Sequence, residues 1–187
     1  MNQRTLILLN KADLEKYQSK HIAIFGIGGV GGYVLEALVR SGFLNIDIYD
    51  FDKIDESNLN RQIISTMKTI GLNKTDVAFK RMKEINPDLN LNTFNLWINK
   101  ESINMIDFKK YDYIVDAIDF VEGKIEIIKK CHDLNIKLIS SMGTGNKLDP
   151  SKLYITDIQK TTICPLARVI RRKCKDIDIK HFNVLVS

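Results

Sequence analysis

The sequence is poor in cysteine and in long apolar runs, and both absences exclude classes of protein. Its three cysteines, Cys131, Cys164 and Cys174, form no CxxC pair. A disulfide framework and a structural zinc site built from cysteines alone are therefore not expected. Residues 1–20 are polar with scattered apolar positions, and no apolar run reaches the length of a signal-peptide core or a membrane span. We expect a cytoplasmic protein with no integral membrane segment.

Internal repeats and low-complexity tracts are also lacking, and there are only three prolines and ten glycines. Hydrophobic residues make up 44% of the chain and charged residues 27%, which is ordinary for a globular domain. A length of 187 residues indicates one domain, or one and a fraction, and is enough to bury a sizeable core. The composition therefore excludes a disordered or fibrous protein.

The net charge of +5 is a mild excess, and its distribution is more informative than its size. Five cations fall within eight residues near the end of the chain. Such a cluster could contact phosphate-rich RNA, although a solvated helix face is the more economical interpretation of the cluster alone. The five are Arg168, Arg171, Arg172, Lys173 and Lys175.

Strand and helix patterns alternate along the chain. Ile22–Phe25 is a continuous apolar run ending in glycine, which is typical of a strand buried on both faces. Apolar residues then recur at helical spacing until Gly42. The alternation predicts an α/β, Rossmann-like fold with a mostly parallel sheet flanked by helices. Further strands are predicted over 45–49, 89–96, 113–115, 137–141, 154–158 and 182–186, and further helices over 73–85, over 121–134 and from Pro165.

A glycine motif, Gly26-x-Gly28-x-x-Gly31, lies between the first predicted strand and the helix that follows it. In that context glycines allow a tight turn, and backbone N–H groups at a helix N-terminus can approach a phosphate. Asp50 ends the second strand, at the place where an acid holds the ribose of NAD, and it could equally hold the ribose of ATP. The motif and Asp50 therefore leave a dehydrogenase and an ATP enzyme both open.

The segment after Asp50 favours ATP over NAD. An NAD site needs neither an arginine nor a run of amide side chains just past the acid that holds the ribose. Arg61 and Asn58 can contact phosphate oxygens, and Lys74 can add a second cation. Lys74 alone would be interpreted as a surface residue of a helix, and the interpretation depends on the whole set.

Two aspartates follow the predicted strand 113–115, at the sheet edge where ligands of open α/β folds collect. A carboxylate facing a triphosphate is a natural Mg²⁺ ligand. Asp119 lies further from the strand than Asp116 and is the better candidate, whereas Asp116 could instead bond to nearby turn amides. Arg4 on its own would be a surface residue.

These residues together resemble the ThiF/MoeB/HesA family, the bacterial relatives of ubiquitin-activating enzymes. The resemblance covers essentially the whole chain. Residues 112–119, 141–150 and 164–168 look more specifically like the subfamily of tRNA threonylcarbamoyladenosine dehydratases. The resemblance to the family as a whole rests on residues 26–31, Asp50-Phe51-Asp52, residues 57–62, Lys74, Ile85-Asn86-Pro87 and residues 116–119.

The resemblance implies an ATP-dependent adenylating enzyme. In the subfamily, ATP activates the threonylcarbamoyl carboxylate of a tRNA adenosine, and loss of AMP closes a ring. Arg4 would reach the ATP site of the partner in a homodimer, and Asp119 would hold Mg²⁺. Arg61 and Lys74 would act with them on the phosphates. The predicted nucleotide-binding set is Gly26, Gly28, Gly29, Gly31, Asp50, Asp52, Ser57, Asn58, Asn60, Arg61, Lys74 and Asp119.

Two departures from the wider family favour the dehydratase: no CxxC pairs for zinc are present, and no cysteine is convincingly placed for catalysis. Activation of a small ubiquitin-like sulfur-carrier protein, with a sulfur-relay partner, stays open as the first alternative. An NAD-dependent oxidoreductase is a distant second. A non-catalytic scaffold is a third, which Arg61, Lys74 and Asp119 argue against.

The predicted organisation has two parts. Residues 1–160 form an ATP-binding adenylation domain, with an N-terminal arm over 1–20 that reaches a partner subunit. Residues 161–187 start a C-terminal part with the basic helix and a strand. Since the sequence stops inside a predicted strand, we expect that a C-terminal portion is absent from it.

Overall fold

The structure is a computed structural model that describes residues 4–145 and 147–187. Residues 1–3 of the predicted arm, and Asn146 of the stretch 141–150, lie outside the described residues. The strands are β1 (His21–Phe25), β2 (Asn45–Tyr49), β3 (Asn90–Phe94), β4 (Tyr113–Asp116), β5 (Lys137–Ser141), β6 (Tyr154–Asp157) and β7 (Asn183–Val186).

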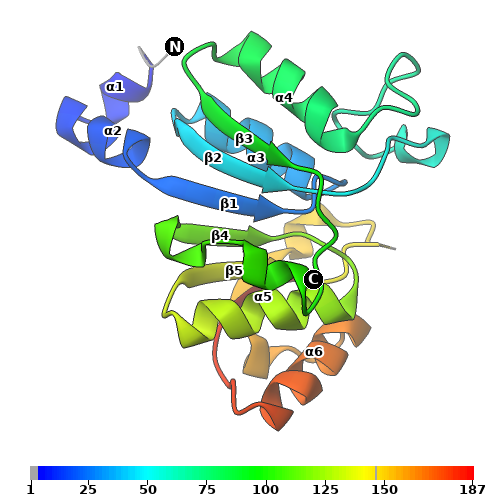
Figure 1. Ribbon diagram of the computed structural model, residues 1–187. Helices are drawn as coiled ribbons and strands as arrows, with labels where there is room; N and C mark the ends of the chain where they lie inside the picture. Colours follow the sequence, from blue (N-terminus) through cyan, green and yellow to red (C-terminus); the bar gives the residue numbers. More distant parts are fainter. Residues whose placement is uncertain (1–3, 146) are drawn as a thin grey trace.

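The seven strands form one sheet in the order β3-β2-β1-β4-β5-β7-β6 (Figure 1). All neighbouring strands are parallel except β6, which runs antiparallel to β7. The prediction of a Rossmann-like, mostly parallel sheet is therefore confirmed. β7 pairs with β5 within this sheet, and the division of the chain at residue 160 stays a prediction.

Helices cover both faces of the sheet. They are α1 (Thr5–Leu8), α2 (Lys11–Gln18), α3 (Gly31–Arg40), α4 (Lys74–Ile85), α5 (Val121–Asp133) and α6 (Pro165–Asp176), with short 3₁₀ turns η1 (Glu56–Asn58), η2 (Ser102–Met105), η3 (Phe108–Lys110), η4 (Pro150–Lys152) and η5 (Ile158–Lys160). Across residues 4–145 and 147–187, none is long and apolar enough to cross a membrane.

The alternating side chains of β1 divide the core into two layers. Ile22 and Ile24 pack with α3 and α4, whereas Ala23 and Phe25 pack with α5 and α6. Figure 1 shows the two helix pairs on opposite sides of the sheet. Because both faces of β1 are covered, its sequence is a continuous apolar run, as predicted.

The strand order reverses at β1, since β2 and β4 both lie beside it. In an open parallel sheet, this reversal leaves a crevice at the carboxyl ends of the strands, where ligands bind. The glycine motif follows β1. Asp116 is the last residue of β4, and Asp119 lies three residues further along the chain. The fold therefore brings the predicted site residues of both segments to one edge.

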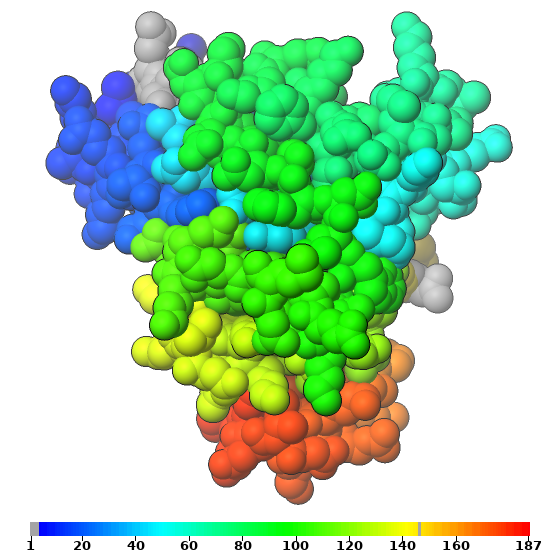
Figure 2. All heavy atoms as spheres, in the orientation of Figure 1, coloured from blue at the N-terminus to red at the C-terminus, as the bar shows by residue number. Residues whose placement is uncertain are grey.

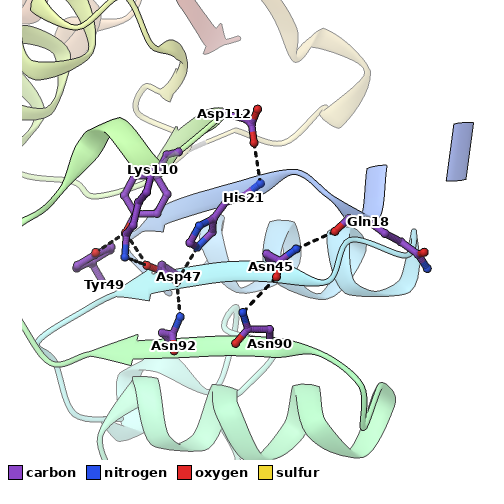
Figure 3. Close-up of polar contacts among 10 residues, drawn as sticks. Gln18, His21, Asn45, Asp47, Tyr49, Asn90, Asn92, Lys110 and Asp112 are labelled. Carbon is purple, nitrogen blue, oxygen red and sulfur yellow. Dashed lines mark hydrogen bonds and ion pairs between the residues drawn. The ribbon is translucent and has the colours of Figure 1, made fainter. Parts of the chain in front are cut away.

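A buried carboxylate ties the amino-terminal half of the sheet together. Asp47, in the middle of β2, is fully buried and accepts four hydrogen bonds. His21 Nε2 and Asn92 Nδ2 lie 2.9 and 2.8 Å from Oδ1, while Lys110 Nζ and the Tyr111 hydroxyl each lie 2.6 Å from Oδ2. Figure 3 shows His21, Asn92 and Lys110 turned toward Asp47. We call these five residues the Asp47 cluster.

Candidate functional site

Two glycines of the motif are required by close packing. Gly26 has φ +86°, and a Cβ there would lie 2.8 Å from the carbonyl oxygen of Ala117. A Cβ on Gly31 would lie 1.8 Å from the carbonyl oxygen of Gly26. Gly28 and Gly29 have more room around them, so the first and last glycines shape the turn and the middle two leave space beside it.

Asp50 stabilises the glycine loop and the start of the next segment through hydrogen bonds to their backbone. Its carboxylate accepts the backbone N–H of Ile27 at 2.6 Å and that of Asp52 at 2.9 Å. Burial raises the pKa of Asp50 above its usual value, and the nearby charge of Lys74 offsets part of that rise. With 9% of the residue exposed, Asp50 supports the loop, and its predicted contact with a ribose stays a prediction.

The segment after β2 holds its polar residues in a 3₁₀ turn. Asn58 is buried, and its side chain accepts the N–H of Asp55, completing a capping box. Arg61 is exposed, and its stem would lie 3.3 Å from a Cβ on Gly29. Its guanidinium donates to the Ser57 carbonyl at 2.8 Å and to Asn60 Oδ1 at 3.0 Å. Arg61 is therefore beside the glycine loop, as a phosphate-binding role requires.

Lys74, the first residue of α4, is only 5% exposed, which is inconsistent with a surface residue. Its Nζ donates to Asp52 Oδ2 at 2.6 Å, and the Asp52 carbonyl accepts the N–H of Lys74 at 3.0 Å. Hydrogen bonds connect Lys74 to the glycine loop in steps, because the N–H of Asp52 donates to Asp50 and the same Asp50 carboxylate accepts the N–H of Ile27. Arg61 therefore lies beside the glycine loop, and Lys74 is connected to that loop through Asp52 and Asp50.

The two aspartates after β4 differ sharply. Asp119 is exposed, and within the described residues its side chain makes no hydrogen bond or ion pair. Asp116 is fully buried, accepting Lys124 Nζ at 3.0 Å and the Ser140 hydroxyl at 2.5 Å. A bond from the turn amide of Ile118, at 3.3 Å, is only its third contact. We call Asp116, Lys124 and Ser140 the Asp116 cluster.

A metal would have to be held largely by the nucleotide. In the described part of the chain, no three His, Cys, Asp or Glu side chains gather as a metal site. Mg²⁺ in phosphate sites is commonly bound by one or two carboxylates together with the phosphates of the substrate. The free carboxylate of Asp119 fits that requirement.

Sequence reasoning missed an aromatic cluster at the same edge. Phe51, Trp97 and Phe120 follow β2, β3 and β4 respectively. The rings of Trp97 and Phe120 stack with centroids 4.0 Å apart, and Phe51 meets Trp97 edge-on at 4.2 Å. Trp97 is 41% exposed, and half-exposed aromatic rings can stack on a nucleobase. The signal in the sequence was that each residue comes directly or shortly after a strand.

Gln62, the last residue of the 57–62 motif, is not among the predicted site residues. It is 6% exposed, and its Nε2 would lie 3.8 Å from a Cβ on Gly28. A buried amide beside the open part of the glycine loop is placed to contact a ligand there.

Two predicted features lie away from this edge. Arg4 is exposed at the start of α1, which lies beyond the amino ends of the strands (Figure 1). The structure therefore does not bring Arg4 to the glycine loop of its own chain, and its role in a partner's site stays a prediction.

The basic helix α6 forms one end of the molecule (Figures 1 and 2). Arg168, Arg172, Lys173 and Lys175 are exposed, as a contact with phosphates would require. Arg171 differs from them, because its guanidinium donates to the carbonyl and the hydroxyl of Thr161 at 2.7 and 2.5 Å. Four of the five predicted cations therefore form the accessible basic face.

The three cysteines are buried and unpaired. Burial raises the pKa of Cys131 to about 12, with a further contribution from Asp116, and raises that of Cys174 to about 11. Thiols with such pKa values are poor nucleophiles at neutral pH.

The chain is similar to enzymes of one family. Residues 2–180 match the ThiF family. The chain is 37% identical to the tRNA threonylcarbamoyladenosine dehydratase of Bacillus subtilis, over 95% of this chain and 70% of that relative. It is 33% identical to the enzyme of the same name from Escherichia coli, over 91% of this chain and 64% of that relative.

The chain is also similar to solved structures of enzymes with this name. The Escherichia coli tRNA N6-threonylcarbamoyladenosine dehydratase in complex with ATP superimposes with a TM-score of 0.93 at 30% identity, over 98% of this chain and 79% of that one. The family match spans nearly the whole chain, and the similarity extends from the sequence to the arrangement of the sheet. The chain therefore belongs to the ThiF family.

Proposed function

We propose that this chain uses ATP to adenylate a carboxylate, and that the carboxylate is the threonylcarbamoyl group of a tRNA adenosine. The observation that carries the proposal is that exposed Arg61 lies beside the glycine loop and buried Lys74 is hydrogen-bonded to it through Asp52 and Asp50. Two cations at a glycine loop that opens a helix fit a triphosphate better than a dinucleotide. The names of the similar enzymes supply the substrate.

We propose the ATP site from the charge and the position of its residues. The N–H groups of the glycine loop and the side chains of Asn58, Arg61 and Lys74 would contact the phosphates, and Asp50 the ribose. The aromatic cluster of Phe51, Trp97 and Phe120 would face the adenine, since all three residues lie at the same sheet edge. Asp119 would hold Mg²⁺, which neutralises phosphate charge when it is bound.

The chemistry needs positioning and positive charge rather than a nucleophile from the protein. A carboxylate oxygen of the substrate attacks the α-phosphorus of ATP, and pyrophosphate leaves. A nitrogen or oxygen of the same substrate then attacks the activated carbonyl, and AMP leaves as the ring closes. Arg61 and Lys74 offset the negative charge that would otherwise keep the carboxylate from the triphosphate.

Three further assignments belong to this proposal. In a homodimer, Arg4 would enter the partner's site and add a third cation. The exposed cations of α6, Arg168, Arg172, Lys173 and Lys175, would contact the phosphates of tRNA. The enzyme would act in the cytoplasm, where its tRNA substrate is found.

Replacing Asp119 tests the site. Asp119→Ala should slow the conversion of ATP to AMP by about 100-fold, since loss of one preorganised charged contact typically costs about 3 kcal/mol in the transition state. Asp133→Ala is the matched control, because Asp133 is an exposed carboxylate at the other end of α5. Turnover by Asp119→Ala at the rate of the control would refute the metal assignment.

The choice of substrate needs a separate assay. Pyrophosphate exchange should be stimulated by tRNA that carries the threonylcarbamoyl nucleoside. Stimulation only by a small protein with a di-glycine tail would assign the chain to carrier activation instead. Tight binding of NADH in a parallel titration with ATP would refute adenylation altogether.

A further inference from the structure

A buried lysine links two loops at the site edge. Lys124, in α5, is fully buried. Its Nζ lies 3.0 Å from Asp116 Oδ2, 2.7 Å from the carbonyl oxygen of Ser141 and 3.4 Å from the Ser140 hydroxyl. The ammonium therefore has an acceptor for each of its three hydrogens, provided by the ends of two neighbouring strands.

Packing alone does not explain a charge at this position. Three other buried residues of α5 belong to the apolar core, namely Ile127, Ile128 and Cys131. Replacing a buried ion pair by apolar residues of similar volume is often neutral or stabilising. The pair of Lys124 and Asp116 is thus a costly way to fill the space, and its location indicates another use.

The first loop that it holds carries Asp119. Asp116 is the last residue of β4, and Lys124 is in the first turns of α5, so the ion pair joins the two ends of residues 117–123. The other oxygen of Asp116 accepts the N–H of Ile118 at 3.3 Å. The carbonyl of Ala117 is in turn the group that packs against Gly26. Displacement of this loop would therefore move Asp119 and disturb the glycine motif together.

The second loop leaves the end of β5. The carbonyl of Ser141, which accepts from Lys124, directly precedes residues 142–145. Gly143 lies near the start of α6, since a Cβ there would be 3.8 Å from Cys164 Sγ. Lys124 consequently connects the Asp119 loop to the loop that leads toward the basic helix.

We propose that Lys124 is a positioning residue for the nucleotide site, which fixes the loop of Asp119 against the end of β5 through Asp116 and Ser141. The proposal rests on the proposed function for its kinetic readout. Lys124 does not touch the reacting atoms in this account. Through Asp116 it positions the loop that carries Asp119, the proposed Mg²⁺ ligand.

Lys124→Met is the direct test, because methionine keeps the length of the side chain and removes the charge. We expect kcat for AMP formation to fall by about 100-fold, as a displacement of about 1 Å can cause. The Mg²⁺ concentration for half-maximal rate should rise, which a loss of stability alone would not produce. Asp47→Asn is the control, since it perturbs a buried carboxylate with an ammonium partner away from the site.

A second variant keeps the test decisive if Lys124→Met fails to fold. Asp116→Asn with Lys124→Met removes both charges and leaves no buried ion unpaired, so it should fold and still show the low kcat. A folded double variant with the kcat and Mg²⁺ dependence of the control would overturn the proposal.

Nucleotide binding separates this proposal from the proposed function. Trp97 is the only tryptophan and is near the predicted adenine position, so its fluorescence can report ATP binding without turnover. If the wild-type protein forms no AMP, the proposed function fails. Weaker Mg²⁺-dependent ATP binding in the Lys124→Met variant than in Asp47→Asn would still support positioning, and equal binding would contradict it.

Discussion

The Asp47 cluster and the Asp116 cluster are two solutions to the same problem. Both centre on a fully buried aspartate in a strand beside β1, and both include a lysine ammonium. The partners of Asp47 come from strand β3, the start of β1 and the segment before β4. The partners of Asp116 come from α5 and the end of β5.

The two clusters differ in which segments of the chain adjoin their residues. Asp47 in β2 bonds to His21 of β1 and Asn92 of β3, so the Asp47 cluster connects three neighbouring strands. Behind the Asp116 cluster are the loop of Asp119 and residues 142–145 at the carboxyl edge. A buried carboxylate therefore holds neighbouring segments together in both clusters. Only Asp116, at the end of its strand, holds segments that belong to the proposed nucleotide site.

The largest effect expected from a test of the two clusters is a loss of stability when Asp47 is replaced. Asp47→Ala should lower the free energy of unfolding by about 3–5 kcal/mol, because it leaves buried donors and a lysine without their acceptor. Urea unfolding followed by circular dichroism measures this. The kcat of the protein that remains folded should stay at the wild-type value, and a large drop in kcat would break the distinction between the clusters.

A matched pair of hydroxyl deletions should give a smaller effect. Tyr111→Phe and Ser140→Ala each remove one donor to the central carboxylate. Each should cost about 1–3 kcal/mol of stability, as expected when a buried hydrogen-bond partner is lost. Only Ser140→Ala should also reduce the rate of AMP formation. Equal rates for the two variants would contradict the comparison.

The smallest effect is a dependence of stability on pH. Burial tends to raise the pKa of Asp47, but hydrogen bonds from Lys110 and its other donors outweigh this, and its pKa lies below the usual 3.8. The folded protein therefore binds fewer protons here than the unfolded chain. The resulting stabilisation is present above pH 3.8 and is lost as the pH falls through the lowered pKa.

Acid unfolding of Asp47→Asn tests that sign. The variant should lose less stability than the wild-type protein when the pH is lowered below 3.8. Parallel curves for the two proteins would show that Asp47 titrates in the folded state much as it does in the unfolded chain.

Most of the fold could be predicted from local sequence. β1 and β2 match their predicted ranges to within one residue, since Gly26 and Asp50 mark where the two strands end. The helices α1 and α2 were not predicted, because α1 has only four residues and α2 buries only Leu14, so neither shows a repeating apolar face. A helix with so little apolar periodicity gives the sequence no signal to detect.

Candidate site residues could be named from the sequence where a motif contains them, whereas contacts between residues far apart in the chain could not be foreseen. Lys74 resembles any helix surface lysine until Asp52, 22 positions earlier, is seen to pair with it. Lys124 was not singled out in the predicted helix 121–134, because its burial depends on Asp116 and Ser141. Arg171 was counted with the RNA-facing cations, although Thr161 engages it.

The central claim is that this protein activates and cyclises the threonylcarbamoyl nucleoside of tRNA. Mass spectrometry of the nucleosides, after tRNA is incubated with ATP and this protein, tests it most directly. The account predicts that the threonylcarbamoyl nucleoside loses one water, and that the loss requires ATP and is abolished in Asp119→Ala. An unchanged nucleoside, with ATP consumed only when a di-glycine-tailed protein is present, would contradict it.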